Sequence, residues 1–127
     1  MKHILTCSFG KDSIATALLA LQYGEPMDEL VYSEVMFSDT VSGELPEHKR
    51  FIYETAIPYF EKRGIPTRVL RGQKTYLDCF YHIVSRGNAE GKLASFPLTG
   101  RCSIQRDCKL PPIRTYQKTL PPDTVYY

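Results

Sequence analysis

The stretch Ser8-Phe9-Gly10-Lys11-Asp12-Ser13 decides the fold, because it joins a strand-like run to a helix-like one. Residues 3–7, which precede it, form an apolar run suited to a short buried strand. The apolar residues that follow it have helical spacing: Ile14, Ala17, Leu18 and Leu21. A small turn that contains glycine leaves backbone N–H groups free at the helix N-terminus, where the helix dipole adds positive charge. The stretch therefore predicts a strand–turn–helix unit that suits a phosphate.

Three side chains of this turn add to the prediction. Lys11 supplies a mobile cation, and Asp12 and Ser13 fit the first helical turn. Asp12 could also hold a Mg²⁺ ion bound to phosphates. The pattern is not a Walker A loop, which needs four residues between its glycines and then Gly-Lys-Ser/Thr.

Strand-like and helix-like segments alternate along the chain, which is typical of a parallel α/β sheet. We expect strands at about 2–8, 30–37 and 67–70 and helices at about 12–23, 46–63 and 76–85, with a further short helix after Pro111-Pro112. Pro58 lies inside the second helix and should kink or split it. The 127 residues are expected to form one domain. The expected fold is a Rossmann-like three-layer α/β/α sandwich with a mostly parallel sheet of about four or five strands.

Composition and charge limit the classes of function. Apolar residues make up 43% of the chain and charged residues 24%, as in soluble globular proteins. The formal net charge of +2 does not indicate nucleic acid, but bases gather in residues 62–74 and 101–118, which favours a small, multiply charged ligand. The sequence shows no signal-peptide pattern and no membrane span. Its four cysteines then indicate a reducing cytoplasm.

A second motif follows the second expected strand. Asp39 and Thr40 come just after the run Val35-Met36-Phe37-Ser38, where ligands bind in parallel α/β sheets. Asp39 could bind a ribose hydroxyl or a metal ion. The alternative is a turn or a helix cap, which Asp and Thr often supply after a strand.

These motifs together resemble those of one family. Residues 8–13 resemble the PP-loop, Ser-Gly-Gly-x-Asp-Ser, of the adenine-nucleotide alpha-hydrolase superfamily, and Phe9 is typical of its phosphoadenosine phosphosulfate (PAPS) reductase branch. Asp39-Thr40 and Leu45-Pro46-Glu47 resemble that branch's second motif, with Val41 in place of a glycine. Arg101-Cys102 and Lys109-Leu110-Pro111-Pro112 resemble its Arg-Trp-Cys and Lys-x-x-Pro elements, although the chain has no tryptophan and the spacer is longer.

The resemblance implies an adenine nucleotide, namely PAPS, adenosine 5′-phosphosulfate (APS) or ATP, and sulfonucleotide reduction with a thioredoxin-like reductant. Arg101 and Lys109 would hold the sulfate or the 3′-phosphate. It gives the remaining contacts to the nucleotide to Ser8, Phe9, Gly10, Lys11, Asp12, Ser13, Asp39 and Thr40. A homo-oligomer is an open alternative to a monomer.

Two other functions remain alternatives. An N-type ATP pyrophosphatase would activate an acceptor and release pyrophosphate, with Mg²⁺ near Asp12 and Asp39; the intact Lys11-Asp12-Ser13 favours it. A nucleotide-binding module without turnover is the third. In either enzyme Lys11 and Asp12 belong to the catalytic set.

The cysteines bear on the choice between these functions. The family's catalytic Glu-Cys-Gly element is absent, and residues 123–127 resemble a strand that has just begun, so we expect a chain truncated at its C-terminus and inactive by itself. Cys102, between basic residues that include Arg106, is the substitute nucleophile. Cys102 and Cys108 could form a redox pair, or with Cys79 hold zinc or an iron–sulfur cluster. Inert thiols are the alternative.

Overall fold

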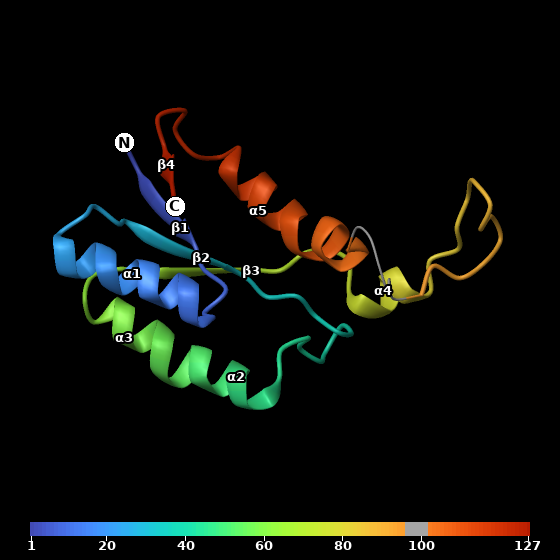
Figure 1. Cartoon of the computed structure of the whole chain (residues 1–127), viewed down its shortest axis with the longest axis horizontal. Coiled ribbons are helices and arrows are strands. Elements are labelled where there is room, and N and C mark those ends of the chain that lie inside the picture. Colours follow the sequence, from blue (N-terminus) through green and yellow to red (C-terminus); the bar gives the residue numbers. More distant parts are fainter. Residues whose placement is uncertain (96–101) are drawn as a thin grey trace.

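The computed structural model describes residues 1–95 and 102–127. Four parallel strands form its sheet, in the order β3-β2-β1-β4. They are β1 (His3–Thr6), β2 (Glu29–Ser33), β3 (Thr67–Leu70) and β4 (Val125–Tyr126). Helices connect the strands and cover both faces of the sheet (Figure 1). The expected α/β sandwich with a parallel sheet of Rossmann type is therefore confirmed.

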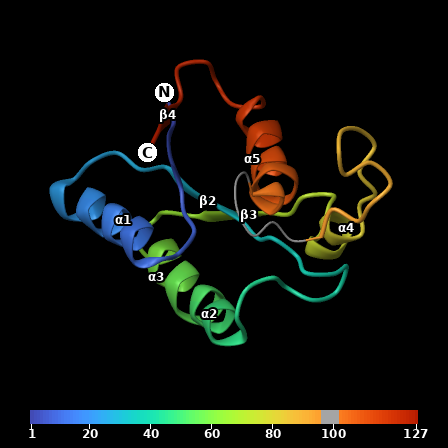
Figure 2. The same cartoon turned by 45° about the vertical axis from the view of Figure 1, so that its right-hand side comes forward.

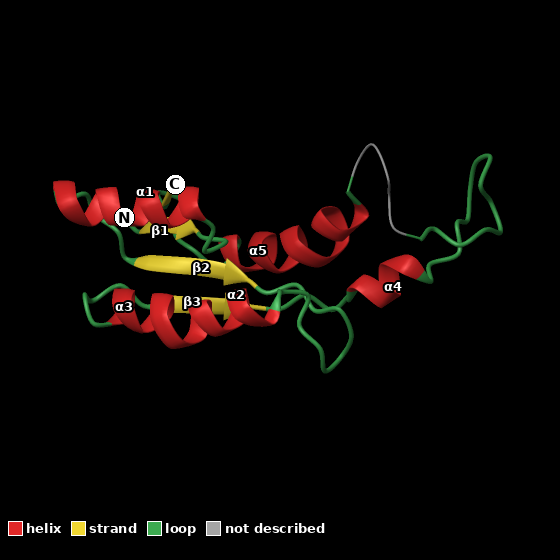
Figure 3. Ribbon diagram, turned by 60° about the horizontal axis from the view of Figure 1, so that its bottom comes forward, coloured by secondary structure: helices red, strands yellow, loops and turns green. Residues whose placement is uncertain are grey.

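One face of the sheet is covered by the helices that follow β1 and β2. Helix α1 (Lys11–Tyr23) ends at Gly24, whose φ of 67° suits glycine. After β2 come α2 (Pro46–Phe51), the π-helical turn η1 (Ile52–Ala56) and α3 (Ile57–Glu61). Figure 3 shows these helices running alongside the strands. Buried side chains of β1, β2, α1 and the α2–α3 helices form the main core: Leu5, Cys7, Phe9, Ala17, Leu30, Tyr32, Ile52, Ala56, Phe60 and Ile65.

Pro58 has the effect that its place in the helix predicts. The chain from Pro46 to Glu61 stays helical but is divided into α, π and α segments. Pro58 has no N–H group to donate to the preceding turn, and the wide π turn lies directly before it. At that turn the Ile57 N–H donates to the Ile52 carbonyl, five residues back. The split is thus a local widening of one helix.

The other face is covered by η2 (Gln105–Lys109) and α5 (Leu110–Gln117). Figures 1 and 2 show α5 on the side of the sheet opposite α1 and α3. The Ser33 hydroxyl donates to the Lys109 carbonyl at 2.9 Å. Helix α5 includes both Pro111 and Pro112 and begins before the expected position. It continues directly from the wide π turn η2, as α3 with Pro58 continues from η1.

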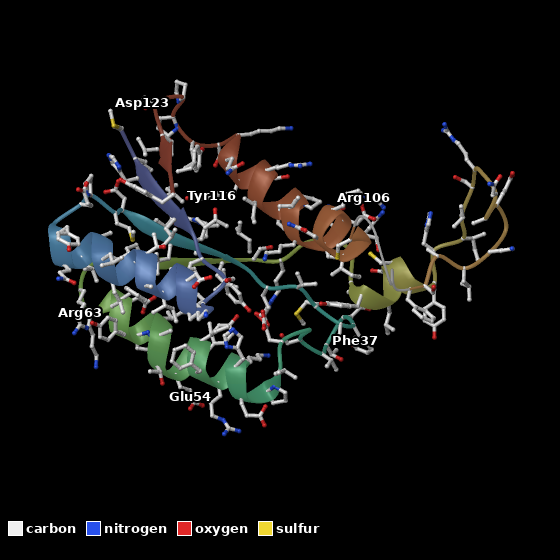
Figure 4. The ribbon with its side chains drawn as sticks, in the orientation of Figure 1. Phe37, Glu54, Arg63, Arg106, Tyr116 and Asp123 are labelled. Carbon is white, nitrogen blue, oxygen red and sulfur yellow. The ribbon has the colours of Figure 1, made fainter. Side chains whose placement is uncertain are left out.

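A buried carboxylate joins α5 to the sheet on this second face. Glu29 of β2 accepts hydrogen bonds from Arg68 of β3, at 2.6 Å, and from the Tyr116 hydroxyl of α5. The Arg68 guanidinium also lies 4.6 Å from the centre of the Tyr116 ring. Figure 4 shows Tyr116 between α5 and the strands. Three elements therefore share one ion-paired contact.

β1 is shorter than the expected 2–8, and β2 and α4 are also shorter than expected, the last two for the same reason. β2 ends at Ser33, because its partner β3 ends opposite it at Leu70. Helix α4 (Tyr76–Phe80) stops well before residue 85, because later residues bond to residues 92–95. The Ala94 N–H donates to the His82 carbonyl at 2.7 Å, and the Ser95 N–H to the Phe80 carbonyl at 3.0 Å. Residues 81–95 form an arm that projects from the body (Figure 1).

No helix in the described ranges is long and apolar enough to cross a membrane.

Candidate functional site

The strand order places the candidate site at the C-terminal end of β1. The chain passes from β1 to β2 to β3 on one side, and then returns to add β4 on the other side of β1. In open parallel sheets ligands bind where the order reverses in this way. A cleft of about 710 Å³ lies there, and Thr6, Cys7 and Ser8 at the end of β1 line it.

Phe9 fixes the turn between β1 and α1. It has a φ of 58°, which is uncommon outside glycine, and its side chain is 1% exposed. Its ring packs edge-to-face on Tyr32 at a centroid distance of 5.4 Å. Phe9 is thus an anchor in the core and does not line the cleft, whereas the expectation counted it among the nucleotide contacts.

Helix α1 starts just after the cleft wall: Ser8 lines the cleft, whereas Gly10, Lys11, Asp12 and Ser13 do not. Gly10 is its N-cap in an extended conformation, and none of the described side chains caps the helix. The Ser13 hydroxyl donates to the Gly10 carbonyl at 3.2 Å and lies 3.3 Å from the Ser8 hydroxyl. Lys11 and Asp12 are exposed. The helix therefore offers N–H groups and a partial positive charge to an anion.

The opposite wall comes from residues a hundred positions later in the chain. Cys102, Ile104, Gln105 and Lys109 line it. Within residues 1–95 and 102–127 the Lys109 ammonium makes no ion pair, while its backbone carbonyl is fixed by Ser33. The structure thus brings Ser8 and Lys109 to one cleft. Arg101 lies outside the described residues.

Side chains that the sequence did not single out form the floor and the rim. The Tyr32 hydroxyl donates to Glu44 at 3.1 Å, and both residues line the cleft. Burial, followed by the charge of Glu44, raises the pKa of Tyr32 well above its usual range. Gly43 packs closely under Tyr76, where a Cβ would lie 2.8 Å from the ring. A tyrosine inside a strand and a glycine in a loop gave no local signal for these roles.

Asp39 and Thr40 lie at the tip of a small hairpin after β2. The Phe37 N–H donates to the Val41 carbonyl at 2.8 Å, and Met36 pairs with Ser42 across the hairpin. Both residues of the motif are exposed, and neither lines the cleft. The Ser38 hydroxyl, not the Asp39 carboxylate, closes the turn by accepting from the Val41 N–H at 3.2 Å.

The cysteines are arranged differently from the expected set. Cys79 and Cys108 meet with their sulfurs 3.4 Å apart, and both are buried. Cys102 is exposed at the cleft, where its sulfur accepts from the Gln105 N–H at 3.5 Å. In the described part of the chain no three side chains of His, Cys, Asp or Glu are grouped as a metal site requires. The set Cys79, Cys102 and Cys108 is therefore not assembled as metal ligands.

Arg106 does not serve Cys102 as the sequence suggested. Its guanidinium donates twice to Asp107, at 2.8 Å each. It lines a separate pocket of about 310 Å³, together with Cys79. The Arg106 guanidinium is therefore paired with the Asp107 carboxylate and not with the Cys102 sulfur.

A buried carboxylate beside the cleft was also missed. Glu34 is 0% exposed, accepts from the Tyr53 hydroxyl, and accepts from Arg71 Nη2 at 3.1 Å. Lys49 Nζ lies 3.8 Å from its other oxygen. Burial raises the pKa of Glu34, but the hydrogen bonds from Tyr53 and Arg71 outweigh burial and hold that pKa below its ordinary range. Arg71, which belongs to the basic segment 62–74, is thus ion-paired with a buried residue of the protein itself.

Comparison of the chain with models of known families, with curated proteins and with solved structures finds no match.

Proposed function

We propose that the cleft binds an adenine nucleotide of the sulfonucleotide type, PAPS or APS, as the resemblance to PAPS reductases implies. Two observations carry the proposal. The uncapped N-terminus of α1, at Gly10, follows two residues after Ser8 of the cleft wall. Lys109 also lines the cleft, and among the described residues its ammonium makes no ion pair. A ligand with two separated anionic groups suits this arrangement, because each charge meets a positive partner.

The roles follow from these positions. The backbone of residues 10–13 and the Lys11 side chain hold the phosphate next to the ribose. Lys109 holds the sulfate or the 3′-phosphate. Cys102 is the exposed thiol at the cleft and the candidate nucleophile for the sulfuryl group. Attack of the Cys102 sulfur on the sulfuryl sulfur would break its bond to the phosphate oxygen, release the nucleotide and leave an S-sulfocysteine. A thioredoxin-like dithiol would then reduce that group, releasing sulfite and the Cys102 thiol and becoming a disulfide itself.

Isothermal titration calorimetry of the two basic positions tests the anion roles. Lys109→Ala should lower the affinity for PAPS about tenfold, because one charge-assisted hydrogen bond is lost. It should lower the affinity for AMP by less than roughly twofold. Lys118→Ala, an exposed lysine at the end of α5 outside the cleft, is the matched control and should change neither. Equal losses for PAPS and AMP would show that Lys109 only packs against the sheet.

Gly10 tests the backbone role. A Cβ at Gly10 would have Ser8 Oγ, at 3.5 Å, as its nearest neighbour and would otherwise face open space. The Gly10→Val variant should therefore fold normally. It should still bind every adenine nucleotide more weakly, because the valine side chain blocks approach to the backbone N–H groups at the start of α1. Unchanged binding in a folded Gly10→Val variant would refute the site.

A sulfite-release assay separates the branches. Sulfite release from PAPS that is lost in Cys102→Ser supports the reductase. A preference for ATP with Mg²⁺ and pyrophosphate release would support the pyrophosphatase, and binding without turnover would support the module.

A further inference from the structure

Two buried thiols meet outside the cleft, in a small second core. Cys79 of α4 is 5% exposed and Cys108 of η2 is 1% exposed, and their sulfurs lie 3.4 Å apart. Ile104 is the third buried member of this core, against which Val35 and Tyr76 pack. The pair joins two elements that are separated by more than twenty residues of chain and that hold the walls of the cleft.

The two thiols differ in their surroundings. Cys108 lies 3.5 Å from the Thr75 carbonyl and donates to it. Burial, followed by the adjacent Cys79, raises the pKa of Cys108 to about 12, so Cys108 stays a thiol at neutral pH.

Cys79 has access to solvent from the other side. It lines the pocket of about 310 Å³ together with Lys74, His82 and Arg106. The carboxylates of Asp78 and Asp107 line the same pocket, and Asp107 is paired with Arg106. Cys79 is therefore the member of the pair that lines a pocket which a small oxidant can enter.

We propose that Cys79 and Cys108 form a redox site that converts reversibly between a dithiol and a disulfide. Cys79 faces the oxidant, and Cys108 closes the bond. The inference concerns the second core alone and does not depend on nucleotide binding.

With hydrogen peroxide as the oxidant, the reaction balances in two steps. The Cys79 sulfur attacks one peroxide oxygen, the O–O bond breaks, and the thiol proton leaves with the other oxygen as water, giving a sulfenic acid. The Cys108 sulfur then attacks the Cys79 sulfur, the S–O bond breaks, and a second water leaves with the Cys108 proton. Two thiols thus give two electrons to one peroxide. The sulfurs approach from 3.4 Å to the roughly 2.05 Å of a disulfide.

Geometry also selects the partner. The sequence suggested Cys102 as the redox partner of Cys108, but Cys102 is exposed at the cleft and its sulfur is next to the Gln105 N–H. Cys79 is the thiol in contact with Cys108.

Peptide mapping of the full chain tests the proposal. The reduced protein is treated with one equivalent of peroxide, its free thiols are alkylated, and it is digested without reductant for mass spectrometry. We expect a cross-link between the Cys79 and Cys108 peptides, a loss of two of the four free thiols, and full recovery with dithiothreitol.

Three serine variants complete the test. Cys102→Ser should keep the cross-link, and Cys79→Ser should abolish it. In Cys108→Ser the sulfenic acid on Cys79 should persist and be trapped by dimedone. Circular dichroism checks that each variant folds, and Cys102→Ser, which leaves the buried pair intact, still decides the question if the others do not. A Cys102–Cys108 cross-link, or Cys79 and Cys108 recovered as free thiols while Cys102 is oxidised, would overturn the proposal.

Discussion

Glu34 carries a negative charge at a position with no solvent exposure, at the end of β2. The position is tolerated because Tyr53 and Arg71 donate hydrogen bonds to it and Lys49 lies near its second oxygen. A buried charge without such partners is strongly destabilising. These contacts join the end of β2 to η1, α2 and the segment after β3.

Replacing this carboxylate should reveal its contribution through pH. Glu34→Gln should lower the free energy of unfolding by about 2 kcal/mol at pH 7, because Arg71 and Tyr53 lose a charged acceptor. The pKa of Glu34 is lowered in the folded state, so its stabilisation is complete above the ordinary glutamate pKa of about 4.3 and is lost as the pH falls through the folded value. Urea unfolding followed by circular dichroism at pH 7 and at lower pH measures the difference.

The matched control for Glu34 is Glu54→Gln in η1. Figure 4 shows Glu54 on the side of its helix that faces away from the sheet, and the residue is exposed. It should change stability by less than about 0.5 kcal/mol. A loss in Glu34→Gln that is the same at both pH values would mean that shape, and not charge, matters at this position.

Single residues are also where prediction from sequence reached its limit. Local pattern identified Ser8 and Lys109, and the structure places both at one cleft. Local pattern predicted that Phe9 contacts the ligand, because nothing near it in the sequence shows that its ring packs against Tyr32. It did not pair Cys79 with Cys108 alone, because only the fold brings these two sulfurs to 3.4 Å. Contacts between distant segments decided each of these cases.

At the scale of elements, prediction succeeded where local signals set the boundary. β3 spans 67–70 as expected, and α1 begins one residue before the expected start and ends at Tyr23, where Gly24 stops it. β2 and α4 were predicted too long, because their ends are set by partners: Leu70 opposite Ser33, and the strand-like residues 92–95 beside 80–84. Hydrogen bonds to remote backbone leave no trace in the periodicity of a segment.

The packing of the segment after β3 against η2 depends on the absence of a side chain at Gly72. A Cβ there would lie 2.6 Å from the Cys108 carbonyl oxygen, which is backbone and cannot easily move. Gly72→Ala should therefore lower the free energy of unfolding by about 1–3 kcal/mol, as other overpacked sites do. Chemical denaturation at neutral pH measures it.

Gly10→Ala is the matched substitution, since the new Cβ meets its nearest atom at an ordinary 3.5 Å. It should leave stability nearly unchanged. If Gly72→Ala were as stable as Gly10→Ala, the close approach between these two elements would be wrong.

For the whole molecule, the alternation of strands and helices was enough to predict the α/β sandwich. The strand order was beyond local reasoning, because the pairing of β4 with β1 connects His3 to Val125. The same holds for the cleft, whose walls come from residues 6–8 and 102–109. Sequence indicated which segments are candidates for a site, and the topology determines which of them meet.

Stability should be unevenly distributed over the molecule. None of residues 81–95 is buried, and the arm is held by a few exposed hydrogen bonds, such as that from the Val84 N–H to the Lys92 carbonyl at 2.9 Å. Its amides should exchange with deuterium at least about a hundredfold faster than those of β2, which lies between two strands. Hydrogen exchange with mass spectrometry measures both segments in one sample. Equal protection would mean that the arm packs on the body.

The pairing of β1 with β4 has a consequence for the chain during its synthesis. β1 is made first, and its partner β2 follows after about 25 residues, as the pairing of Ile4 with Glu29 requires. The other edge of β1 receives β4 only when Val125 and Tyr126 have left the ribosome. At about 5–20 residues per second this wait lasts roughly 6–24 s. Throughout that interval the nascent chain exposes an unpaired strand edge, on which a neighbouring chain or a chaperone can dock before β4 arrives.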